Sequence, residues 1–210
     1  METIPGKRAL IITDKVMTKL GVADRATGYL KKGGAEVRVF DEVEPEPSFH
    51  TVLRELKENK EFDPDVIVGI GGGSCMDASK ACRILLEHPQ FPFEDICHMD
   101  GPAKVPISPF MKTTRVAISS TRGTGSDASN VCTLTDNSIP AKHPILSSEL
   151  IPDRAIVGPD IADSRPPEVR IDTGMDALTH GIESYGSVRA NDFSGGNSLH
   201  AIITTPTNSV

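Results

Sequence analysis

The chain has 210 residues, of which 38% are hydrophobic and 24% are charged, enough for one hydrophobic core or for one domain and part of a second. Its 22 basic and 29 acidic residues give a formal net charge of −7, and no run of Lys or Arg is long enough to follow a phosphate backbone. No stretch reaches the roughly 18 apolar residues of a membrane helix, and the first residues lack the layout of a signal peptide. We therefore expect a cytoplasmic protein that binds neither nucleic acid nor membrane.

The spacing of the four cysteines favours reduced thiols. It shows neither a C-x-x-C motif nor the even distribution of a disulfide framework. Free cysteines commonly pack as small hydrophobic residues, and we expect that role for all of them. They are Cys75, Cys82, Cys97 and Cys132.

Strands and helices alternate along the first part of the chain. We expect a strand over residues 8–13, a helix over 15–32, a strand over 36–40 and an amphipathic helix over 50–60. Residues 65–70 form a continuous apolar run, which is typical of a parallel strand buried on both faces, and a helix follows it. This alternation predicts an α/β fold with an open parallel sheet and right-handed crossovers.

An irregular segment separates the later strands from the earlier ones. Residues 91–111 contain four prolines and are expected to form a long surface loop. The chain returns to strand over 115–120, and a last strand is expected over 155–157.

The alternation of strands and helices ends near residues 160–168, which indicates a domain boundary. We assign 1–165 to a first domain and 166–210 to a second one, with helices expected over 173–185 and from 198 to 203. The second part is too short for an independent core without disulfides or a metal, so we expect an incomplete domain. Its first helix should expose an apolar face that consists of Met175, Leu178 and Ile182.

The glycine-rich turn at residues 71–74 (GGGS) lies between a buried strand and a helix that carries Asp77 and Lys80. Glycines let phosphate oxygens approach backbone N–H groups, and the partial positive charge of a helix start favours an anion, so the turn suits a pyrophosphate. It matches neither the Walker spacing nor G-x-G-x-x-G. The alternative is a tight turn that uses glycine for steric reasons alone.

Polar side chains follow two further strands. Residues 120–127 (STRGTGSD) come where open α/β sheets bind ligands, and Thr121 and Thr124 could hydrogen-bond phosphate or ribose oxygens. The alternative for this segment is a helix N-cap with Asp127 as the capping acid. Asp14, at the end of the first strand, could accept from an adenosine ribose hydroxyl or could cap the helix that follows.

Asp176 and His180 stand four residues apart on an expected helix, which places them on one face about 6 Å apart at Cβ. A carboxylate and an imidazole so placed can chelate one divalent cation, and these ligands suit iron(II), manganese or zinc. Two ligands are not a complete site, and the alternative is a surface ion pair. Other candidate ligands or acid–base groups, none selected by its spacing, are His143, Glu183, Asp192 and His200.

Four motifs follow one another along the chain: GIGGGSCMDASKA at 69–81, SSTRGTGSDAS at 119–129, LIPDRAIVGPDIADSRPP at 150–167 and TGMDALTHGIESY at 173–185. In this order they resemble the iron-containing alcohol dehydrogenase family, over nearly the whole chain. The resemblance implies a Rossmann-like nucleotide-binding domain followed by the beginning of an all-helical metal-binding domain. It also implies interconversion of a small alcohol and an aldehyde or ketone with NAD, and a homodimer or higher homo-oligomer of the full-length protein.

Carried over by position, the resemblance implies two sets of binding residues. Asp14 would contact the adenosine ribose and favour NAD over NADP, because a carboxylate repels a 2′-phosphate. Asp176 and His180 match the family's first two metal ligands, for Fe²⁺ with Zn²⁺ or Mn²⁺ as alternatives, and no residue is assigned as a catalytic acid or base. The implied cofactor-binding residues are Asp14, Gly72, Gly73, Ser74, Asp77, Thr121, Thr124, Ser126 and Lys142.

The chain also departs from the family pattern. Glu46 stands where many members have Asn, Arg122 replaces a usual small residue, and Gly158 stands where an Asp is common. The family's first strand and its two remaining metal-ligating histidines are not in the sequence, so we expect a chain truncated at both ends. Two alternatives stay open: a zinc-type glycerol or polyol dehydrogenase relative, and a non-catalytic dinucleotide-binding remnant.

Overall fold

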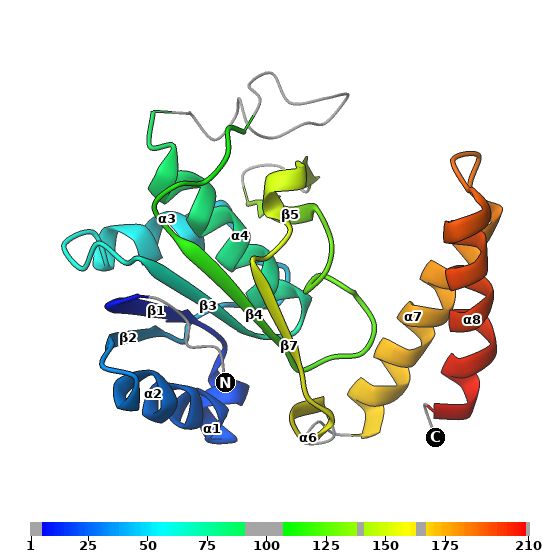
Figure 1. Cartoon of the computed structure of the whole chain (residues 1–210), viewed down its shortest axis with the longest axis horizontal. Helices are drawn as coiled ribbons and strands as arrows, with labels where there is room; N and C mark the ends of the chain where they lie inside the picture. The colour runs from blue at the N-terminus through cyan, green and yellow to red at the C-terminus, as the bar shows by residue number, and fades with distance from the viewer. Residues whose placement is uncertain (1–5, 91–106, 138–140, 163–166, 209–210) are drawn as a thin grey trace. The chain divides into compact units, whose positions relative to one another are not determined.

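The computed structural model describes residues 6–90, 107–137, 141–162 and 167–208 (Figure 1). The chain divides into two compact units. Unit 1 comprises Met1–Ser119 and Ser126–Gly158, and unit 2 comprises Ser120–Gly125 and Pro159–Val210. Most of the expected surface loop, with Cys97, lies outside the described residues; its last five residues, 107–111, form neither helix nor strand.

Unit 1 is built on a five-stranded parallel sheet in the order β2-β1-β3-β4-β7. The predicted parallel sheet is therefore confirmed, and each strand lies within one residue of its expected bounds. The central strand β3 is buried along its whole length, as its continuous apolar run predicts. The strands are β1 (Arg8–Ile12), β2 (Glu36–Phe40), β3 (Val66–Gly71), β4 (Thr114–Ser119) and β7 (Arg154–Val157).

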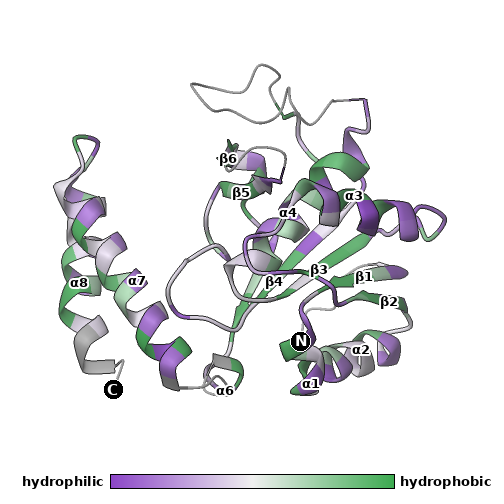
Figure 2. Cartoon of the chain, turned by 180° about the vertical axis from the view of Figure 1, so that it is seen from behind, coloured by the Kyte–Doolittle hydropathy of each residue, from purple (hydrophilic) through white to green (hydrophobic). Residues whose placement is uncertain are grey.

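Helices cover both faces of this sheet, α1 and α2 on one face and α3 and α4 on the other (Figures 1 and 2). They are α1 (Lys15–Lys19), α2 (Val22–Lys32), α3 (Phe49–Glu58) and α4 (Gly73–Glu87). The single helix expected over 15–32 is wrong, because the chain breaks between α1 and α2. Gly21 has a φ of 71° there, in the left-handed region that glycine adopts without steric penalty, and it is the N-cap of α2.

An antiparallel hairpin of β5 (Val131–Asp136) and β6 (Ala141–Leu146), followed by the 3-10 helix η1 (Ser148–Leu150), lies in the chain between β4 and β7. The sequence patterns did not predict it. The available signal was the alternation in β5, where Cys132 and Leu134 are buried and the polar residues Thr133 and Thr135 are only partly buried. The hairpin is attached to the connection between β2 and α3, because the Thr135 N–H donates to the Pro47 carbonyl at 2.9 Å.

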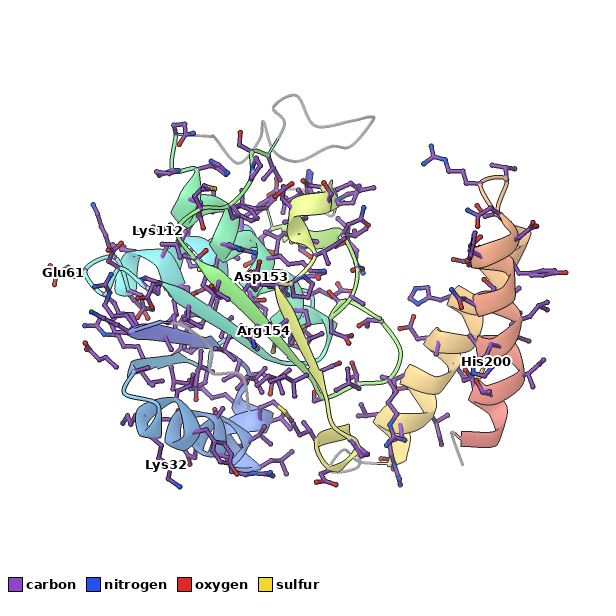
Figure 3. The ribbon with its side chains drawn as sticks, viewed as in Figure 1. Lys32, Glu61, Lys112, Asp153, Arg154 and His200 are labelled. Carbon is purple, nitrogen blue, oxygen red and sulfur yellow. The ribbon has the colours of Figure 1, made fainter. Side chains whose placement is uncertain are left out.

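The interior of unit 1 is mostly apolar but contains charged groups. Figure 2 shows hydrophobic residues gathered in the strands and mixed with hydrophilic residues on α2 and α3. Arg115 on β4 is fully buried, and its guanidinium donates to Ser79 Oγ at 3.0 Å and to two backbone carbonyls. Asp153, labelled at the start of β7 in Figure 3, accepts from the Arg115 backbone N–H at 2.7 Å and pairs with Arg83 at 2.8 Å. The buried cations are therefore hydrogen-bonded.

The cysteines of the described residues are free, as expected. Cys75, Cys82 and Cys132 are all buried. No described helix is both long and apolar enough to cross a membrane.

Unit 2 contains the helices α6 (Pro159–Ala162), α7 (Pro167–Gly186) and α8 (Asp192–Asn208). The last two are longer than expected and pack against each other. Gly181 allows a close approach, since a Cβ atom there would lie 3.1 Å from Ile202 Cγ1, and Ser198 Oγ donates to Ser184 Oγ at 2.9 Å. Part of the expected apolar face of α7 is exposed: Met175 and Ile182 are 57% and 56% accessible, whereas Leu178 is half-buried.

Glu55 on α3 is a buried carboxyl group without a charged partner in the described part of the chain. It is fully buried, its Oε1 atom accepts from the Cys82 thiol at 3.1 Å, and its Oε2 atom has no hydrogen-bond partner among the described residues. Burial raises the pKa of Glu55 to about 8. The group is therefore protonated in the folded protein at neutral pH.

The substitution Glu55→Gln is expected to raise the free energy of unfolding near pH 8 by roughly 2–4 kcal/mol and to change it little near pH 4.5. An unfolded glutamate ionises near its ordinary pKa of 4.5, whereas the folded one holds its proton up to about 8. Wild-type stability should therefore fall as the pH rises between these values, and that of the Gln variant should not. Urea denaturation over this range measures both. Glu61→Gln, at an exposed position (Figure 3), is the control, and an equal response of the two variants would contradict the buried carboxyl.

Candidate functional site

The predicted phosphate-binding turn forms the junction between β3 and α4. β3 ends at Gly71, Gly72 is the N-cap of α4, and Gly73 begins the helix. Gly71 has a φ of 143°, and a Cβ atom there would lie 2.5 Å from Cys75 Sγ, so no larger residue fits without a shift. A glycine N-cap supplies no side-chain oxygen, and the first turn of α4 contains no acidic residue. The N–H groups of this turn are therefore suited to an anionic ligand.

Asp14 lies beside this turn, where the order of the sheet reverses. β2 is on one side of β1 and β3 is on the other, and open α/β sheets bind ligands at the carboxyl ends of strands at such a point. The Asp14 Oδ1 atom accepts from the N–H groups of Val16 and Met17 at 2.8 Å each, which caps α1. Its Oδ2 atom accepts from the Cys75 thiol at 3.4 Å. The capping role is thus confirmed, and the same carboxylate contacts the first turn of α4.

Glu46 joins two of the predicted cofactor residues. Its backbone N–H donates to Ser74 Oγ at 3.2 Å, and its carboxylate Oε1 lies 2.5 Å from the Nζ atom of Lys142 on β6. Glu46 has a φ of 56°, in the left-handed region where Asn is more easily accommodated than Glu. In the sequence this residue stood out only as a departure from the family pattern, and its link to Lys142 could not be foreseen without the β5–β6 hairpin.

Asp77 and Ser126, both implied as cofactor residues, contact each other. Ser126 Oγ donates to Asp77 Oδ1 at 2.7 Å, and Asp77 Oδ2 accepts from the Thr133 N–H at 3.0 Å. The fully buried Lys80 ammonium donates to Ser126 Oγ at 2.9 Å and to the Val131 carbonyl at 2.5 Å. These bonds attach β5 and the segment before it to α4.

Burial shifts the ionisation of both charged groups in this cluster. It raises the pKa of Asp77, although the Lys80 charge and the bond from Ser126 act in the opposite direction. It lowers the pKa of Lys80 to about 8, although Asp77 Oδ1 lies 3.8 Å from the ammonium and opposes the shift. Each charge therefore compensates the other, and loss of either leaves an uncompensated buried charge.

In unit 2, the segment Ser120–Gly125 lies against α7. A Cβ atom added to Gly123 would lie 2.5 Å from the Thr173 carbonyl oxygen and 2.7 Å from Asp176 Oδ2. The first of these neighbours is backbone, which cannot move aside as a side chain can. Glycine at this position thus lets the segment reach the predicted metal-ligating carboxylate.

The expected alternative for the segment after β4, a helix N-cap, is wrong. Residues 120–130 contain turns and bends only, so Asp127 does not begin a helix. Thr121 is half-buried and Thr124 is exposed, and both belong to unit 2, whereas Ser126 belongs to unit 1. The implied cofactor residues are therefore divided between the two units.

Asp176 and His180 lie four residues apart on α7, as expected. Asp176 Oδ1 and His180 Nε2 are 3.8 Å apart, and the side chains are 39% and 54% exposed. This geometry is that of a solvent-exposed pair, and it also leaves both groups accessible to a cation. Among the described residues, no group of three or more His, Cys, Asp and Glu side chains is placed to hold a metal ion.

The other candidate ligands are not gathered around this pair. His143 is only 8% exposed, and its Nε2 atom lies 4.0 Å from Asp136 Oδ2 in the hairpin of unit 1. Glu183 is exposed on α7, and His200 is exposed on α8 (Figure 3). Asp192 lines a hollow of about 390 Å³ where α7 connects to α8.

Comparison with known proteins gives concordant matches. Residues 1–159 match the family model described as iron-containing alcohol dehydrogenase. The bifunctional aldehyde-alcohol dehydrogenase AdhE of Escherichia coli K12 is 38% identical over 93% of this chain and 22% of its own length. The NADPH-dependent butanol dehydrogenase of Clostridium saccharobutylicum is 37% identical over 96% of this chain and 51% of its own length.

A solved structure gives the same result for the fold. The iron-containing alcohol dehydrogenase from Thermococcus thioreducens superimposes with a TM-score of 0.91 at 35% identity, covering 97% of this chain and 53% of that chain. The chain thus spans about half the length of this protein and of the butanol dehydrogenase.

The substitution Asp77→Asn is expected to lower the free energy of unfolding by roughly 2–4 kcal/mol near neutral pH, because it removes the counter-charge of the buried Lys80 ammonium. The part of the loss that comes from the lysine charge should shrink as the pH rises through about 8, the folded-state pKa of Lys80, because a neutral lysine needs no counter-charge. Urea denaturation at several pH values measures it. Asp24→Asn, an exposed carboxylate on α2, is the matched control, and equal losses in the two variants would contradict the pairing.

Proposed function

The chain belongs to the iron-containing alcohol dehydrogenase family, and from this premise we propose that it binds NAD and serves metal-assisted hydride transfer between a small alcohol and an aldehyde or ketone. The observation that carries the proposal is the glycine turn before α4, at the reversal of the sheet and with Asp14 beside it. Because the chain spans about half the length of the butanol dehydrogenase, the activity itself is part of the proposal.

The pyrophosphate of NAD would lie at the first turn of α4. Gly72 and Gly73 leave the backbone N–H groups there open to phosphate oxygens, and the helix dipole favours the negative charge. Ser74 adds a hydroxyl in the same turn. Asp77 would line the pyrophosphate and nicotinamide side together with this turn. Thr121, Thr124 and Ser126 would close over the cofactor, and Lys142 would approach its ribose.

Asp14 supports NAD over NADP. Its carboxylate contacts the first turn of α4 through the Cys75 thiol and follows β1, and the family resemblance implies that the adenosine ribose would lie there. A ribose hydroxyl can donate to a carboxylate, whereas a 2′-phosphate is repelled by it. The butanol dehydrogenase relative is NADPH-dependent, so the two cofactors are compared in the experiment that follows.

The substitution Asp14→Asn is expected to shift the ratio of the NAD and NADP dissociation constants by about tenfold towards NADP, because it removes the repelling charge. Asn caps helices as well as Asp does, so the fold should be retained. Isothermal titration with each cofactor measures the ratio, with Asp24→Asn as the control. An unchanged ratio in a folded Asp14→Asn variant would contradict the placement of the ribose.

Asp176 and His180 would supply two ligands of the metal. Their carboxylate oxygen and imidazole nitrogen fit Fe²⁺, and they also fit Zn²⁺ or Mn²⁺. When bound, such an ion supplies Lewis-acid polarisation of the alcohol oxygen. In this chain the Gly123 backbone lies against Asp176 and limits the orientations open to its carboxylate. No described side chain is assigned as a general base.

The described residues offer two metal donors on one helix, which favours dinucleotide binding without tight metal binding as the second candidate function of this chain. Anaerobic titration with NAD and then with Fe²⁺ distinguishes the two, alongside an activity scan over short alcohols. We expect micromolar NAD binding. One tightly held Fe²⁺ with turnover, both lost in His180→Gln, supports the metal-assisted activity, whereas NAD binding with neither stoichiometric metal nor turnover supports the second candidate.

Two further properties stay predictions from the sequence: a homodimer or higher homo-oligomer, and a cytoplasmic location.

A further inference from the structure

Glu46 has an unusual backbone for its residue type. Its φ of 56° places it in the left-handed region, and its N–H donates to the hydroxyl of Ser74 at 3.2 Å. Ser74 belongs to the first turn of α4, which is the proposed pyrophosphate site. The backbone of Glu46 is therefore held directly at the rim of that site.

The side chain of Glu46 forms an ion pair with Lys142, which lies far from it in the sequence. Its Oε1 atom lies 2.5 Å from Lys142 Nζ on β6, and the two side chains are 62% and 59% exposed. The nearby Glu44 is engaged differently, because its carboxylate accepts from Ser48 and from the Thr51 hydroxyl at 2.6 Å. Glu46 is thus the carboxylate that pairs with Lys142, while Glu44 fastens its own segment to α3.

Charge at this rim matters for a phosphate ligand. A pyrophosphate carries two negative charges, which the start of α4 attracts and the Glu46 carboxylate repels. Lys142 is expected near the cofactor ribose, and its ammonium is paired with Glu46. A bound cofactor and Glu46 would therefore compete for the same ammonium group.

We propose that Glu46 determines the strength of cofactor binding by competing with the bound cofactor for Lys142. The inference rests on the proposed function, since it requires NAD at the turn before α4. It does not involve the 2′ position that Asp14 would contact, so it should affect NAD and NADP alike. An exposed ion pair stabilises weakly, so the expected effect is moderate.

The test is a double-mutant cycle on the full chain with Glu46→Gln and Lys142→Met, read as dissociation constants for NAD and NADP by isothermal titration. Glu46→Gln should tighten both cofactors by about threefold, and the gain should shrink in high salt because the pair is exposed. Lys142→Met should weaken binding by a larger factor in the Glu46→Gln background than in the wild type, again by about threefold.

Asp63 provides a matched control. It is also a carboxylate with a left-handed backbone, with a φ of 48°, and it pairs with Arg8 and with Lys112. Arg8 is the first residue of β1, so Asp63 lies at the amino ends of the strands, whereas the proposed site lies at their carboxyl ends. Asp63→Asn makes the same change of charge and should leave both dissociation constants unchanged.

The outcomes separate this inference from the function on which it rests. Tighter binding of both cofactors with a larger effect of Lys142→Met in the Glu46→Gln background supports the competition. Measurable NAD binding with an unchanged or weaker affinity in Glu46→Gln, or with equal effects of Lys142→Met in both backgrounds, overturns it alone. Absence of NAD binding by the wild type overturns the proposed function and this inference together.

Discussion

The close packing of α4 against β3 is the constraint on which the rest of unit 1 depends. A Cβ atom on Gly69 would lie 2.6 Å from Ser79 Oγ, and one on Gly71 would lie 2.5 Å from Cys75 Sγ, so the helix approaches the strand this closely only because both positions are glycine. The approach places the N-terminus of α4 at the carboxyl end of the sheet. Helix dipole and open N–H groups then favour a phosphate at that point.

The same helix holds later segments of the chain through polar groups. Lys80 binds Ser126 before β5 and Val131 at its start, and Arg83 pairs with Asp153 before β7. The Glu87 carboxylate accepts from backbone N–H groups before β4. Because Lys80 and Arg83 are buried, their polar contacts replace the hydrogen bonds that these cations would make to water. Loss of such a contact would leave a buried charge without compensation. α4 therefore organises both the site and the path of the chain around it.

Several residues serve stability and the proposed function together. Asp14 caps α1 with one carboxylate oxygen and accepts from the Cys75 thiol with the other. Ser126 is implied as a cofactor residue, yet its hydroxyl completes the bonding of a buried lysine. A substitution that changes the charge of such a side chain but keeps its shape can separate its role in stability from its role in cofactor binding. A truncation cannot, because it would disturb folding and cofactor contacts together.

Hydrophobic periodicity and motif order by themselves determined the parallel sheet, the position of the glycine-rich turn and the family, because strand burial and glycine spacing are local properties of the sequence. The break at Gly21 escaped them, since one backbone angle leaves the periodicity of a helix almost unchanged. The tertiary structure alone decided the pairing of Glu46 with Lys142, 96 residues apart, and of Asp77 with Ser126, 49 residues apart. Such contacts depend on how whole elements pack in space, and no local pattern of residues indicates which distant residues will meet.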